Sequence, residues 1–118
     1  MTQVIPILRV TDARASAAFY AHFGFAVEWE HQFEPGLPLF VCVGAEDGAR
    51  VFLSEHAGDA RPDTLLYMYV ENVDALHERL RDAGVEVASP PQDQPWGVRE
   101  LALVDPDRNR LRVGTLLR

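Results

Sequence analysis

Hydrophobic and polar positions follow the same pattern twice along the chain, 60 residues apart. In each copy an apolar segment leads to a residue suited to cap a helix N-terminus, Asp12 or Asn72. Apolar residues at helical spacing follow, and each helix ends at a glycine suited to a left-handed C-terminal position, Gly24 or Gly84. A second extended apolar segment starts directly after the glycine. The pattern indicates an internal repeat.

Each copy predicts the order strand, helix, strand, strand, strand. The predicted strands include residues 8–10, 27–33, 39–43 and 50–53 in the first copy, and 68–70, 85–88, 98–104 and 110–113 in the second. One such unit leaves an apolar sheet face uncovered, so two units are expected to form one core. We therefore predict an α+β fold in a single domain, residues 1–118, made of two tandem βαβββ modules, about 1–57 and 63–118, with half-barrel clefts.

Charge and composition indicate which kinds of partner the protein is expected to bind. The 118 residues carry a formal net charge of −7, which disfavours nucleic acid and is compatible with a cationic small molecule. No segment approaches the roughly 20 apolar residues that cross a bilayer, and the N-terminus lacks a signal-peptide pattern, so we expect a cytoplasmic protein without membrane contact. The single cysteine, Cys42, is expected to be a buried small hydrophobe.

Residue types that carry catalysis lack the required spacing. The four histidines form no two-histidine pattern on one element, and no HExxH motif occurs. His77 is expected to be a half-buried structural residue. His31 and His56 lie near the predicted cleft strands, so each could be a structural residue or could contact a ligand. Ser54 and Ser89 have no base suggested by the sequence, so nucleophilic catalysis has little support.

Several segments resemble one protein superfamily. Leu8-Arg9-Val10-Thr11-Asp12, followed by Ala18-Phe19-Tyr20 and Phe23-Gly24-Phe25, and the turn Asp105-Pro106-Asp107-Arg108-Asn109 resemble the glyoxalase/bleomycin resistance/dioxygenase, or vicinal oxygen chelate, superfamily. Residues 94–103 are similar to the QPWG-REFAL segment of bleomycin resistance proteins, with Val98 inserted. The resemblance implies the paired βαβββ fold predicted above.

The same resemblance locates four positions at which metal-dependent relatives hold a divalent ion. Here these positions are Ile5, Phe52, Leu65 and Arg112. None of these side chains is an ordinary ligand for a cation, and Arg112 is itself positive. We therefore expect no metal, no cofactor and no enzymatic activity. The alternative is a metal-dependent glyoxalase-like isomerase or ring-cleaving dioxygenase.

The resemblance also suggests which residues bind a ligand. In bleomycin resistance proteins a tryptophan of this loop and a phenylalanine at the end of the second strand sandwich the flat part of the drug, and these roles match Trp96 and Phe33. The other predicted ligand-binding residues are Trp29, Gly97, Glu100 and Asp93, with Glu34 as a further carboxylate. Packing in the core is the alternative for Trp96, Trp29 and Phe33, and ordinary surface charge is the alternative for the carboxylates.

Dimerisation follows from the same resemblance. Bleomycin resistance proteins are homodimers that exchange an N-terminal strand, and Pro6 suits a hinge in that segment, although an ordinary edge-strand proline is equally compatible. The predicted function is sequestration of bleomycin or another flat cationic compound in clefts of a homodimer, giving antibiotic resistance. A metabolite-binding module for an unknown ligand on the same fold is the second hypothesis.

Overall fold

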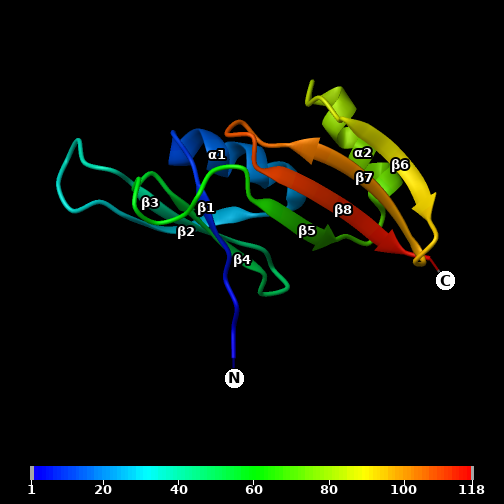
Figure 1. Cartoon of the computed structure of the whole chain (residues 1–118), viewed down its shortest axis with the longest axis horizontal. Helices are drawn as coiled ribbons and strands as arrows, with labels where there is room; N and C mark the ends of the chain where they lie inside the picture. The colour runs from blue at the N-terminus through cyan, green and yellow to red at the C-terminus, as the bar shows by residue number, and fades with distance from the viewer. Residues whose placement is uncertain (1, 118) are drawn as a thin grey trace. The chain divides into compact units, whose positions relative to one another are not determined.

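The repeat predicted from the sequence is present as two βαβββ units in the computed structural model, which describes residues 2–117 (Figure 1). The boundary between the units lies between Thr64 and Leu65. The first unit contains β1 (Ile7–Arg9), α1 (Ala13–Tyr20), the short 3₁₀ helix η1 (Ala21–Phe23), β2 (Ala26–His31), β3 (Phe40–Gly44) and β4 (Arg50–Ser54). The second contains β5 (Leu65–Tyr69), α2 (Val73–Asp82), β6 (Ser89–Gln94), β7 (Val98–Val104) and β8 (Arg110–Leu116). The predicted α+β fold class is confirmed.

The two sheets have the same topology. The strand order is β1-β4-β3-β2 in the first unit and β5-β8-β7-β6 in the second. In each sheet the strand before the helix pairs in parallel with the last strand, and the other pairs are antiparallel. No helix within residues 2–117 is long and apolar enough to cross a membrane.

The helices begin as their capping residues predict. The side chain of Asp12 accepts a hydrogen bond from the backbone N–H of Ala15 (3.1 Å). Asn72 accepts the equivalent bond from Ala75 (3.0 Å). Each bond satisfies one of the backbone donors that the first turn of a helix leaves without an intrahelical acceptor.

The helical segments also end in the same way. Gly24 has φ +93° and Gly84 has φ +77°, a left-handed conformation that glycine adopts without strain. In each unit the residue after the glycine donates its backbone N–H to the carbonyl five residues earlier, which is the Schellman arrangement. The C-terminal glycines predicted from the sequence are therefore confirmed.

Each helix covers one face of its sheet, and the residues on that face form the core. The buried strand residues occupy matching positions 60 apart in the two units: Val41 and Leu101, Val43 and Leu103, Val51 and Leu111, Leu53 and Val113. Strand side chains alternate between faces, so the intervening residues point away from the helix. We call that second face of each sheet the open face.

One predicted strand is misplaced. The sequence predicted a strand at residues 85–88, but the edge strand of the second sheet is Ser89–Gln94. The backbone N–H of Val85 still bonds to the end of α2, so the chain has not reached the sheet at this point. Pro90 and Pro91 are residues typical of a loop. An edge strand can nevertheless contain prolines, because the backbone N–H groups on its outer side do not pair with another strand.

The second strand is shorter than predicted. It ends at His31 and does not reach Phe33, so the prediction that Phe33 lies on the strand is wrong. The chain turns immediately afterwards: the N–H of Leu37 bonds to the carbonyl of Glu34 (3.0 Å), and Gly36 has φ +88°. Pro35 at the second position and glycine at the third are the residues that such a turn favours.

Candidate ligand-binding site

The open face of the first unit carries three aromatic rings in mutual contact. Cross-strand register places Cys42 between Trp29 and Phe52, and Phe40 lies two residues away on the same strand. The rings of Trp29 and Phe40 are stacked at 5.9 Å with an interplanar angle of 11°. Phe52 lies 5.5 Å from Trp29 and 5.1 Å from Phe40. The three rings form a continuous apolar surface on the open face of this sheet.

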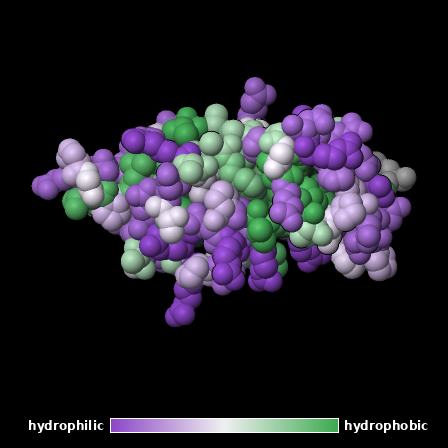
Figure 2. All heavy atoms as spheres, turned by 90° about the horizontal axis from the view of Figure 1, so that it is seen from above, coloured by the Kyte–Doolittle hydropathy of each residue, from purple (hydrophilic) through white to green (hydrophobic). Residues whose placement is uncertain are grey.

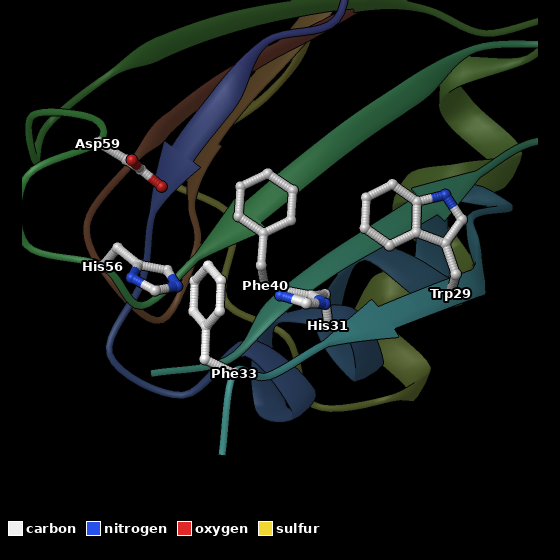
Figure 3. A pocket seen from close by; sticks show the side chains of 6 residues that line it. All are labelled: Trp29, His31, Phe33, Phe40, His56 and Asp59. Carbon is white, nitrogen blue, oxygen red and sulfur yellow. The ribbon is translucent and has the colours of Figure 1, made fainter. Parts of the chain in front are cut away.

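A cavity of about 370 Å³ opens beside these rings. That volume lies within the range of small-molecule sites, roughly 300–1,000 Å³. The view in Figure 3 shows Trp29 at one end of the cavity and Asp59 and His56 at the other, with Phe33, Phe40 and His31 between them. The lining residues are Trp29, His31, Phe33, Phe40, His56 and Asp59. The cavity therefore combines flat aromatic walls, two imidazoles and one carboxylate.

The polar end of the cavity is held by a short hydrogen-bond chain. The buried hydroxyl of Ser54 donates to Oδ2 of Asp59 (2.6 Å) and accepts from the backbone N–H of His56 (3.1 Å). The Phe33 ring lies edge-on to both imidazoles, 4.7 Å from His31 and 6.1 Å from His56. The carboxylate of Asp59 is thus positioned at the cavity edge, where it would favour a positively charged group.

Neither of the predicted aromatic residues in this unit belongs to the core. Trp29 is 45% exposed and Phe33 is 71% exposed, which excludes the alternative that they pack in the interior. Hydrophobic side chains also reach the surface among hydrophilic ones on the face seen in Figure 2. Exposed aromatic rings around a cavity are the usual means of binding a flat ligand.

In the second unit, Trp96 projects from the tip of a hairpin. The three-residue loop between Gln94 and Val98 has a bond from the N–H of Gly97 to the carbonyl of Gln94 (3.1 Å), and Gly97 has φ +88°. This is the geometry of a type I turn followed by a left-handed residue, which accounts for the glycine. Trp96 is 59% exposed, so it is no core anchor.

Beside Trp96, the open face of the second unit carries a polar network instead of aromatic rings. Tyr67 donates its hydroxyl to Oε1 of Glu100 (2.9 Å), and Nε of Arg112 donates to Oε2 of the same carboxylate (2.8 Å). Glu100 is buried, with 9% exposure. A Cβ at Gly114 would clash with the Tyr67 hydroxyl, so the absence of a side chain there lets Tyr67 reach across the strand to Glu100.

The network shifts the titration of its members. Burial, followed by the hydrogen bond to Glu100, raises the pKa of Tyr67 to about 12. Burial alone would raise the pKa of Glu100, but the hydrogen bonds from Arg112 and Tyr67 outweigh it and hold this pKa below its ordinary value. At neutral pH the network therefore contains a phenol, a carboxylate and a guanidinium.

The carboxylates predicted near Trp96 both have arginine partners. Asp93 accepts from Arg99 (3.1 Å), and Arg99 also binds Asp74. Glu100 is held by Arg112 as described. The second unit consequently presents less uncompensated negative charge than the sequence suggests, and Asp59 of the first unit is a carboxylate that the sequence did not single out.

The four positions that hold a metal in relatives do not fit a metal here. Ile5 precedes β1, Leu65 is the first residue of β5, and Phe52 belongs to the aromatic cluster. Arg112 is cationic and already bonded to a carboxylate. Between residues 2 and 117, no group of three or more histidine, cysteine, aspartate or glutamate side chains is placed to hold a metal ion.

Comparisons with known proteins agree with this architecture. Two βαβββ units define the fold class, and a family model described as glyoxalase superfamily protein matches residues 1–116. The chain belongs to the glyoxalase superfamily. It is 28% identical over 121 residues to YraH, an uncharacterized protein of Bacillus subtilis (strain 168), covering 93% of this chain and 94% of that protein.

Solved structures show the same fold. An antibiotic binding protein, TnmS3 from Streptomyces sp. CB03234, superimposes with a TM-score of 0.81 at 22% identity, covering 98% of this chain and 97% of that one. A bleomycin-binding protein complexed with bleomycin superimposes with a TM-score of 0.74 at 21% identity, covering 98% of both chains. At these identities the likeness concerns the fold.

Proposed function

We propose that this chain is a non-catalytic binding protein that sequesters a flat, positively charged antibiotic of the bleomycin type. The observation that carries the proposal is the cavity of the first unit, where Trp29, Phe33 and Phe40 offer aromatic faces and Asp59 offers a carboxylate at the edge. Aromatic faces attract both flat rings and cations, and the carboxylate adds charge complementarity. The bleomycin-binding and antibiotic-binding proteins of the same fold support this choice of ligand.

The proposal includes a homodimer in which N-terminal segments are exchanged. Supporting it, Val4 is 85% exposed, so the segment before β1 makes little contact with its own unit at this residue. Pro6 lacks an N–H donor, and its carbonyl accepts the bond from Phe52 (3.0 Å). Because Pro6 has no backbone N–H, the segment can change direction at this residue without leaving a backbone donor of Pro6 unpaired.

The test is a titration of the purified protein with bleomycin, followed by calorimetry and tryptophan fluorescence. We expect one ligand per chain, a mass by light scattering of two chains, and an affinity that a chelator such as EDTA does not change. Phe33→Ala should weaken binding about tenfold, because stacking contributes roughly 0.5–1.5 kcal/mol beyond the area buried. The same variant should unfold like the wild type, since Phe33 is 71% exposed.

Val27→Ala is the matched control, because Val27 is 50% exposed on the strand that carries Trp29 but does not line the cavity. Cells that produce the wild-type chain or the Val27 variant should survive bleomycin, and cells that produce Phe33→Ala should not. Equal binding by the two variants would show that the cavity is not the site. Tight binding without any gain in survival would instead favour a metabolite as the physiological ligand.

A further inference from the structure

Arg112 on the open face of the second unit has more hydrogen-bond donors than its bond to Glu100 uses. Its Nε is bonded to Glu100, but within residues 2–117 no partner is present for Nη1 or Nη2. The Arg112 side chain is 38% exposed, so the two amino groups are accessible. Two amino groups in one plane match the two oxygens of a carboxylate.

We propose that Arg112 and Trp96 form a binding subsite for a planar aromatic carboxylate. The guanidinium would hold the carboxylate through its two free amino groups, and the indole would stack on the aromatic ring. This subsite lies within the second unit and uses none of the residues that line the aromatic cavity. It can therefore be tested separately from ligand binding in that cavity.

The guanidinium is held in a fixed orientation before any ligand arrives. Glu100 holds Nε from one side, and both oxygens of this carboxylate are occupied, because Tyr67 donates to the other. The guanidinium carbon lies 5.4 Å from the centre of the Tyr67 ring and 5.6 Å from that of Trp96. These ring contacts restrict the guanidinium, so less side-chain entropy is lost when it binds a ligand.

The charge around Arg112 favours a ligand with a hydrogen-bond acceptor, although the chain as a whole is acidic. Glu100 and Arg112 neutralise each other, and among residues 2–117 the Nη1 and Nη2 groups of Arg112 remain as donors without a partner. The net charge of −7 is spread over the whole sequence, and at physiological ionic strength charges beyond about 8 Å are largely screened. The neighbouring indole, 59% exposed, supplies an apolar face for the rest of the ligand.

The test uses benzoate and benzamide, which share shape and ring but differ in charge. In a nuclear magnetic resonance titration of the wild-type protein, benzoate should shift the side-chain N–H signals of Arg112 and Trp96. Benzoate should bind at least about tenfold more tightly than benzamide, as expected when a hydrogen-bonded partner carries a charge. Equal affinities, or shifts confined to other residues, would overturn the proposal.

Variants distinguish the contribution of the Arg112 guanidinium from that of stacking on Trp96. Arg112→Lys keeps a positive charge beside Glu100 but lacks the paired amino groups, and it should remove most of the preference for benzoate over benzamide. Trp96→Ala should weaken both probes by a similar factor. Arg110→Lys is the matched control, since Arg110 lies two residues away on the same face of β8. If Arg112→Lys binds benzoate like the Arg110 control, the assignment is wrong.

Discussion

The two open faces of the molecule occupy equivalent positions of the repeat yet have opposite chemistry. In the first unit the face is aromatic, and the rings of Phe40 and Phe52 pack on Trp29. In the second unit the face is a hydrogen-bonded network that contains a charge pair. The equivalent positions, 60 apart, are Phe40 and Glu100, Phe52 and Arg112, and Ile7 and Tyr67.

The faces that pack under the helices did not diverge in this way. Four pairs of strand positions 60 residues apart are buried and apolar in both units: Val41 and Leu101, Val43 and Leu103, Val51 and Leu111, Leu53 and Val113. The helix side of each sheet therefore maintains the fold, while the open side is free to take whatever chemistry a ligand requires. This division explains how one architecture carries an aromatic cavity in the first unit and a hydrogen-bonded polar network in the second.

The largest effect on stability is expected when the second open face is changed to resemble the first. Arg112→Phe should lower the free energy of unfolding by about 2–3 kcal/mol, because it leaves the buried Glu100 carboxylate without its cation. This value is below that of a fully buried pair, since the Arg112 side chain is 38% exposed. The double variant E100F/R112F should recover at least half of the loss, because it restores an apolar pair. Urea unfolding at neutral pH measures both.

Arg110→Phe is the control for adding an exposed ring to β8, and its stability should stay within about 0.5 kcal/mol of the wild type. A double variant that is no more stable than Arg112→Phe would contradict the argument. In that case the polar network would be needed for the fold of the second unit and not only for its surface chemistry.

A second, smaller effect is expected at Gly114. Its equivalent in the first unit is Ser54, where a side chain is tolerated and bonded to Asp59. Gly114 differs because Tyr67 crosses over it, and an added Cβ would clash with the Tyr67 hydroxyl. Gly114→Ala should therefore lower the free energy of unfolding by about 1–3 kcal/mol, the usual cost of overpacking. Denaturant unfolding is the measurement.

Gly58→Ala is the matched control, because a Cβ at Gly58 would meet no heavy atom within 4 Å. Its stability should stay within about 0.5 kcal/mol of the wild type or rise, since alanine restricts the unfolded chain. In the Tyr67→Phe background, which lacks the obstructing hydroxyl, Gly114→Ala should cost less than it does alone. Additive costs would show that Tyr67 is not the reason for the glycine.

The fold was predictable from the sequence because its signals are local. N-cap residues, C-terminal glycines and the alternation of buried strands are each readable within a few positions, and the repeat at 60 residues reinforced them. The edge strand β6 was misplaced for an equally local reason, since Pro90 and Pro91 indicate a loop unless the strand is known to lie at an edge.

The sites were less predictable because they depend on strand register. Trp96 was predicted from its Pro-Trp-Gly loop, and Phe33 from the resemblance to bleomycin resistance proteins. Trp29, His31 and His56 were predicted from their positions on or near the strands of the cleft. Phe40 and Asp59 were missed because neither stands in a motif. The hydrogen bond between Tyr67 and Glu100 joins residues 33 positions apart across β8, and no local sequence pattern predicts it.

The smallest of the expected effects concerns Tyr67 itself. Its pKa of about 12 lies above the ordinary value of 10.0, so the phenol ionises in the unfolded chain before it ionises in the folded one. Its contribution to stability is therefore complete below pH 10 and is lost as the pH rises toward 12. Tyr67→Phe should unfold about 1 kcal/mol more easily at neutral pH, through loss of one hydrogen bond, and should lack this part of the alkaline decline.

Tyrosinate absorbance measures the same titration directly. The sequence contains no lysine, so few other groups titrate in that range. Subtracting the curve of Tyr67→Phe from that of the wild type should reveal one phenol with a midpoint near pH 12. Tyr69→Phe is the control, because Tyr69 lies 5.1 Å from Tyr67 but is 66% exposed. A midpoint near pH 10 for Tyr67 would mean that Glu100 does not hold the phenol in solution. The polar character assigned to the second open face would then rest on the Arg112 ion pair alone.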